Sequence, residues 1–164
     1  MAIDAVTALL FLPFALPIGI WVAWNDMKFM KIPNKAVGAL LGVFVIVGLI
    51  ALPLEDYLWR YLHFIVVLIV GFLANMARAM GAGDAKFLAA MAPMLDLGDL
   101  QILLILFSGV LLAAFFTHRL FRMVPATRRA FPDWESWDRG DFPMGLALGG
   151  VLILYLLLGA VAGS

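Results

Sequence analysis

The sequence predicts an all-α integral membrane protein: a bundle of six transmembrane helices with the N-terminus outside and the large loops in the cytoplasm. The chain has 164 residues, of which 65% are hydrophobic and 13% charged, and its mean hydropathy is +1.07. A soluble domain averages about 45–50% apolar and about 25% charged residues. Six apolar runs and a one-sided distribution of basic residues add to this evidence. We expect one transmembrane domain over residues 1–164.

Each predicted span follows from the roughly 20 apolar residues that a helix needs to cross a membrane. The first run lacks the basic segment that opens a signal peptide, so we expect it to be retained. The fourth run is unusual, because its charge-free part covers residues 87–95 alone and the helix must extend back through Asp84. We predict spans at residues 5–25, 36–54, 60–78, 80–97, 100–117 and 142–162, with a cytoplasmic loop at 118–141.

Basic residues set the predicted orientation, because Lys and Arg accumulate in cytoplasmic loops. With the N-terminus outside, Arg60 is the one basic residue on the outer side. The others fall on the cytoplasmic side: Lys28, Lys31, Lys35, Arg78, Lys86, Arg119, Arg122, Arg128, Arg129 and Arg139. This asymmetry favours both the number of spans and their direction.

Two aspartates are expected at similar membrane depth, although they are far apart in the chain. Asp26 follows the first span and Asp84 opens the fourth, and both positions face the cytoplasm in this topology. Two close carboxylates do not readily ionise together, so one would hold a proton while the other stays charged. Such a pair supplies a general base that activates water and a general acid that polarises a peptide carbonyl.

The residues around the two aspartates fit this chemistry. Gly81 and Gly83 lack side chains and would let an extended substrate backbone approach the carboxylate. Pro33 disfavours helix at Ile32, so it would separate the first two spans. Asn34 would then cap the second span.

Simpler structural explanations remain open for these residues. Asp26 could be an ordinary interfacial acid, and Asp84 could pair with Lys86 at an exposed helix end. The lysine could also extend to the membrane surface without a further role. Gly38 and Gly42 form a pattern of small residues that favours close packing between helices.

Other residue types that often carry chemistry are absent or are explained by packing. The chain has no cysteine, which excludes disulfides, thiolate metal sites and a cysteine nucleophile. Its two histidines are far apart and offer little basis for a zinc site. We interpret His63 as a packing residue, and Trp134 and Trp137 as anchors at the membrane interface.

Three segments resemble the motifs of one family, the type IV prepilin peptidases, which are intramembrane aspartyl proteases of the GxGD type. The segment "DMKFMKIPN" (residues 26–34) resembles the first motif, and "GAGDAKF" (81–87) the second. The segment "FPMGLALGG" (142–150) resembles the one that opens the last span in short members. Chain length and this third segment resemble the branch that serves tight-adherence (Flp) pili. Ala82 stands where glycine is common, a change that we expect to have no effect.

The resemblance implies an aspartic endopeptidase of the bacterial inner membrane that removes the leader peptide of type IV prepilins at the cytoplasmic face. Asp26 and Asp84 would be the catalytic pair. The residues implied in the motifs or in substrate binding are Ile32, Pro33, Asn34, Gly81, Gly83, Lys86, Pro143 and Gly145. The implied partners are membrane lipid and a prepilin with a basic leader followed by a hydrophobic helix. No metal, organic cofactor or nucleic acid is implied.

Larger members of the family carry a cytoplasmic loop with a cysteine tetrad and also N-methylate the mature pilin. This chain has no cysteine, so we expect peptidase activity without N-methyl transfer. Two other functions compete with this interpretation. One is an ion- or proton-coupled transporter that uses the aspartates as a relay, and the other is a non-catalytic assembly factor of the pilus system.

The loop at 118–141 suggests how a basic leader could be attracted. We hypothesise that its acids steer the leader toward the membrane surface, because unlike charges favour encounter. Nearby arginines could instead neutralise these acids or bind anionic lipid. The acids are Asp133, Glu135, Asp138 and Asp141.

Overall fold

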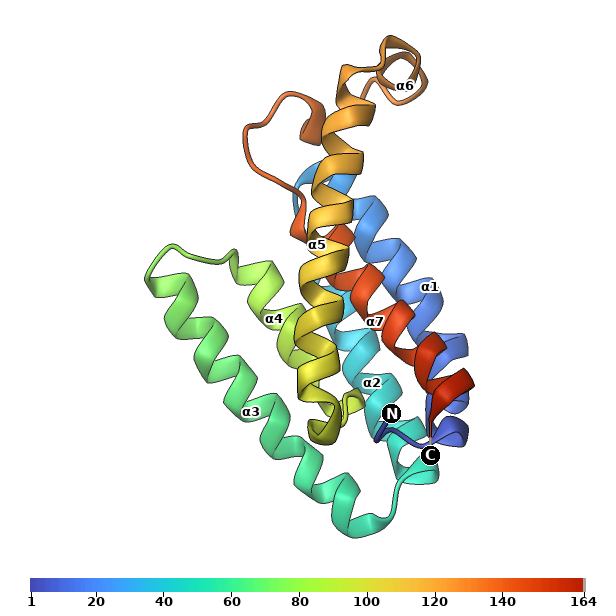
Figure 1. Cartoon of the computed structure of the whole chain (residues 1–164). Helices are drawn as coiled ribbons and strands as arrows, with labels where there is room; N and C mark the ends of the chain where they lie inside the picture. The colour runs from blue at the N-terminus through green and yellow to red at the C-terminus, as the bar shows by residue number, and fades with distance from the viewer. Residues whose placement is uncertain (164) are drawn as a thin grey trace.

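The computed structural model describes residues 1–163, and these form helices and short 3-10 turns without a strand (Figure 1). The predicted all-α class is therefore confirmed. The elements in order are α1 (Ala5–Phe29), α2 (Asn34–Ala51), α3 (Leu54–Met76), α4 (Ala82–Met91), the turns η1 (Ala92–Met94) and η2 (Leu97–Asp99), α5 (Leu100–Met123), α6 (Pro125–Ala130), η3 (Glu135–Trp137) and α7 (Met144–Ala162).

Within residues 1–163, five helical segments are long and apolar enough to cross a membrane, which identifies a multi-pass membrane protein. They comprise α1, α2, α3, α7 and the segment Leu97–Met123 that contains α5. The predicted fourth span is not a continuous helix: α4 has ten residues, about 15 Å, half of the ~30 Å hydrocarbon core. Pro93 lacks an amide hydrogen and cannot continue the helical ladder, so the chain passes into η1.

The segment at 118–141, predicted as a loop, is partly helical. Helix α5 continues past Thr117 to Met123, and α6 and η3 lie within the remainder. Both chain ends lie at one end of the bundle, where the amino group of Met1 donates a hydrogen bond to the Ala162 carbonyl at 2.9 Å. The connections that follow α1, α3 and α5 gather at the opposite end (Figure 1).

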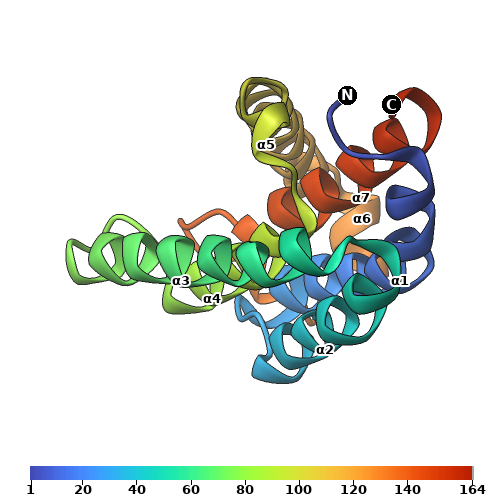
Figure 2. The same cartoon turned by 90° about the horizontal axis from the view of Figure 1, so that it is seen from below.

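Helices α1 and α7 pack closely side by side (Figures 1 and 2). The contact depends on two glycines, because a Cβ at Gly149 would lie 2.5 Å from the Gly19 carbonyl oxygen. Small residues allow two helix backbones to approach in this way inside a membrane. The contact aligns Asp26, two helical turns beyond Gly19, with Gly145, one turn before Gly149.

Helices α3 and α5 diverge from each other, with α4 lying against α3 (Figure 2). The far end of α4 is held by buried Arg60, which donates hydrogen bonds to the carbonyls of Pro93 and Leu95 and pairs with Asp96 at 2.7 Å. Arg60 therefore holds η1 and the chain that follows it, and with them the end of the helix that begins near Asp84.

The small-residue pattern on α2 does not pack as predicted. A Cβ added at Gly38 or at Gly42 would meet nothing within 4 Å. Helix α2 instead turns other residues inward, including Leu40 and Phe44. Spacing of small residues was a weak guide here, because on its own it cannot show which face of the helix meets a neighbour.

Candidate active site

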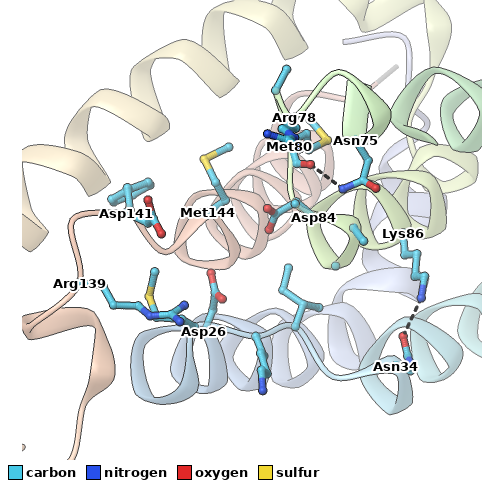
Figure 3. A pocket seen from close by; sticks show the side chains of 18 residues that line it. Asp26, Asn34, Asn75, Arg78, Met80, Asp84, Lys86, Arg139, Asp141 and Met144 are labelled. Carbon is cyan, nitrogen blue, oxygen red and sulfur yellow. Dashed lines mark hydrogen bonds between the residues drawn. The ribbon is translucent and has the colours of Figure 1, made fainter. Parts of the chain in front are cut away.

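A cavity of about 760 Å³ lies at the end of the bundle opposite the chain termini (Figure 3). Its walls come from the ends of α1 and α3, the starts of α2, α4 and α7, and the segment before α7. Asp26 and Asp84 both line this cavity and face it from opposite sides. The tertiary structure thus brings together the two aspartates that the sequence singled out.

Asp26 lies near the end of α1 and faces α7. The residue is 5% exposed, and its Oδ2 accepts a hydrogen bond of 2.7 Å from the backbone amide of Gly145. A Cβ at Gly145 would lie 2.8 Å from the Asp26 Cβ, so a larger residue cannot enter without displacing the aspartate. Gly145 therefore positions the carboxylate through its amide and through its lack of a side chain.

Asp84 lies in the first turn of α4 and is partly buried. Its Oδ2 lies over Gly81, where an added Cβ would come within 2.5 Å of that oxygen. A Cβ at Gly83 would lie 3.3 Å from the Cβ of Ile32. Gly83 thus lets the second motif pack against the first, and Gly81 leaves room for the Asp84 carboxylate. Both glycines line the cavity, and access of a substrate backbone beside them stays a prediction.

A second contact between the motifs involves Lys86 and Asn34. The lysine Nζ donates a hydrogen bond of 3.3 Å to Asn34 Oδ1 across the cavity (Figure 3). The predicted cap at Asn34 is wrong: Pro33 is the N-cap of α2 and has no side-chain hydrogen bond, while Asn34 is the first helical residue. Its amide turns toward the lysine instead of toward its own helix.

Three predicted residues lie behind the cavity wall. Pro33, Pro143 and Gly145 do not line the cavity, whereas Ile32, Asn34, Gly81, Gly83 and Lys86 do. Pro143 is buried and is the N-cap of α7, so it sets where that helix begins. It thereby places Gly145 in the first turn, where the amide is free to bind Asp26.

Two residues of the site could not be found by sequence pattern. Met30 and Arg78 line the cavity, and they are the only non-glycine residues among those described that have a positive φ, 51° and 59°. Side chains rarely adopt this left-handed conformation, which costs about 1–2 kcal/mol per residue. Such strain collects at functional sites. Neither residue type signals this backbone conformation in a sequence.

The segment between α5 and α7 is held by aromatic contacts. Trp137 is buried, stacks on His118, and donates a hydrogen bond from Nε1 to the Phe131 carbonyl. Trp134 stacks on Phe131 and meets the edge of Trp24 on α1. The interfacial role predicted for Trp137 is wrong, because this ring packs inside the protein. These contacts hold the chain next to Arg139 and Asp141, which line the cavity.

His63 lies away from the aspartates, in α3. It lines a separate cavity of about 280 Å³ between α3 and the start of α5. Both ring nitrogens are buried and have no hydrogen-bond partner among the described residues. Asp96 lines the same cavity together with apolar residues, and the interpretation of His63 as a packing residue stays a prediction.

Fold and site together define a multi-pass α-helical membrane protein in which two aspartates face one cavity beside the loops. A sequence model of the type IV leader peptidase family matches residues 10–118. The match covers more than half of the chain, and the protein therefore belongs to this family. Searches of curated proteins and of solved structures found no significant match.

Proposed function

We propose that the protein is an intramembrane aspartyl endopeptidase that removes the leader of type IV prepilins at the cytoplasmic face of the bacterial inner membrane. The observation that carries the proposal is the placement of Asp26 and Asp84 on opposite sides of one cavity. Family membership supports a peptidase reaction and a prepilin substrate. The absence of cysteine favours cleavage without N-methyl transfer.

In the proposed reaction, one aspartate of the pair acts as the general base and the other as the general acid. The Gly145 amide occupies Oδ2 of Asp26, so Oδ1 is the oxygen available to bind the attacking water. One aspartate takes a proton from this water as its oxygen attacks the scissile carbonyl carbon. The other donates a hydrogen bond to the carbonyl oxygen and then gives its proton to the leaving amine. The two carboxyl groups exchange roles as the C–N bond breaks.

The position of the cavity supports cleavage close to the membrane surface. It lies beside the loops, and its basic lining residues are Lys31, Arg78, Lys86 and Arg139. At such a place a leader peptide in water can meet the helix that follows it in the membrane. Helix α4 is short and begins with Gly81 as its N-cap. This leaves the Asp84 carboxylate at a helix end, and not in the middle of a long helix.

The decisive test is co-expression with a candidate prepilin, with leader removal scored by gel shift. Asp26→Asn and Asp84→Asn keep the side-chain size but remove the titratable proton. We expect each change to abolish processing while the protein still inserts into the membrane. Normal cleavage by both variants would refute the aspartyl mechanism, and ion flux in vesicles would then be measured. Cleavage retained by one variant alone would refute a pair that acts as a unit.

A further inference from the structure

Arg78 occupies a backbone position that normally belongs to glycine. Helix α3 ends in a Schellman motif, in which the amide of Arg78 bonds to the Asn75 carbonyl and that of Ala79 to the Ala74 carbonyl, both at 2.9 Å. The residue at the left-handed position of this motif is usually glycine. Arg78 adopts it with φ of 59°. An arginine at this position therefore carries backbone strain that a glycine would avoid.

That side chain has no partner of its own. Arg78 is exposed at the cavity, above Asp84 (Figure 3), and within residues 1–163 its guanidinium forms no hydrogen bond or ion pair. A guanidinium is planar and offers a fork of donors that matches a carboxylate. The guanidinium donors of Arg78 are therefore free to bind a carboxylate.

The cavity as a whole carries an excess of positive charge. Its charged lining consists of Lys31, Arg78, Lys86 and Arg139 against Asp26, Asp84 and Asp141. If the aspartate pair shares one proton, two negative charges oppose four positive ones. A substrate that fills this cavity is favoured when it brings a carboxylate of its own.

We propose that Arg78 is a specificity-determining residue that binds an acidic side chain of the substrate beside the scissile bond. This inference rests on the proposed peptidase function. Arg78 is better placed for the role than the other cations. Lys86 already donates to Asn34, and Lys31 and Arg139 lack the conformational strain that marks Arg78. A lipid phosphate is the less favoured ligand, because Arg78 shares a cavity wall with Met80 and Asp84.

The experiment uses the purified full-length protein in nanodiscs and a candidate prepilin, with kcat and KM measured separately. Arg78→Gly removes the side chain and also relieves the strain, so its melting temperature should be no lower than that of the wild type. We expect kcat/KM to fall about ten- to a hundredfold, mostly through KM. Arg78→Lys should recover part of the loss. Arg129→Gln, an exposed arginine outside this cavity, is the matched control and should cleave normally.

A scan of the substrate identifies the partner. Each Asp or Glu of the prepilin is changed to its amide, and one change should lower kcat/KM for the wild type but cause little further loss with Arg78→Gly. Unchanged cleavage by Arg78→Gly, or a lowered melting temperature, would overturn the inference. So would a loss that occurs with every substrate variant and depends on the anionic lipid of the nanodisc, which would assign Arg78 to a lipid headgroup. A wild type that cleaves nothing would refute the proposed function itself.

Discussion

The two aspartates are held by very different parts of the molecule. Asp26 lies on α1, which packs along α7, and half of the most apolar 18-residue stretch of α7 is buried inside the protein. Asp84 lies in the first turn of the ten-residue α4, which packs against α2, α3 and α7. Asp26 is buried, whereas Asp84 is only partly buried at the start of a helix whose later residues Phe87, Ala90 and Met91 belong to the core.

Because of this difference, we expect substitutions beside Asp26 to affect both stability and catalysis, and substitutions beside Asp84 to affect catalysis alone. The position of Asp26 depends on backbone contacts between two long helices, so a disturbance there should reach the core. Asp84 is only partly buried in the first turn of α4, and what faces Gly81 is the end of its side chain, so a disturbance at Gly81 should remain local.

Enlarging Gly145 should have the largest effect. The new Cβ of Gly145→Ala would lie 2.8 Å from the Asp26 Cβ, which forces α7 or the aspartate to move. Since a misplacement of about 1 Å can cost about a hundredfold in rate, we expect a loss of that order and a lower melting temperature. Gly150→Ala, on the same helix but against Val110, is the control and should retain most of the activity. Normal cleavage by Gly145→Ala would show that the amide contact does not position Asp26.

Enlarging Gly81 should reduce the rate without unfolding the protein. An added Cβ lies 2.5 Å from Asp84 Oδ2, and the end of a side chain can turn away at little cost. We expect cleavage to fall about tenfold, with a melting temperature within one or two degrees of the wild type. Gly109→Ala, where a Cβ meets nothing within 4 Å, should leave both quantities unchanged. A large loss of stability in Gly81→Ala would contradict the contrast between the two aspartates.

Reversing the acids of the segment at 118–141 should have a smaller effect that depends on salt. Asp138 is already paired with Arg128 at 2.6 Å on the surface, whereas Asp141 lines the cavity. We therefore expect Asp141→Lys to slow cleavage at low salt severalfold and Asp138→Lys to have less effect, because exposed charges are screened. Rates that are unchanged at low salt after all four acids are reversed would refute the steering hypothesis.

Alanine at Gly38 or Gly42 should have the smallest effect. Both positions are open in the structure, and replacing glycine inside a helix stabilises it by about 0.5–1 kcal/mol. We expect a small rise in melting temperature and normal cleavage. A fall in stability or activity would show instead that this face of α2 packs against another molecule.

Much of the helical architecture followed from the apolar runs, because a stretch of about 20 apolar residues has few stable alternatives in a membrane. The exception was the region from Asp84 to Asp99. There Pro93 and a short charge-free run produced a short helix and two turns. The prediction assumed one long helix, since hydropathy measures the apolar character of a segment and not its continuity.

By itself, the sequence determined the membrane class, the helical runs and the two aspartates with their motifs, because composition and residue spacing carry that information directly. The tertiary structure alone decided that the Gly145 amide holds Asp26, that Lys86 reaches Asn34, and that Arg78 stands unpaired at a strained turn. The physical reason is that lipid-facing and core-facing residues are equally apolar in a membrane protein. Hydropathy therefore cannot tell which faces meet, and backbone contacts between distant segments exist only after the helices have packed.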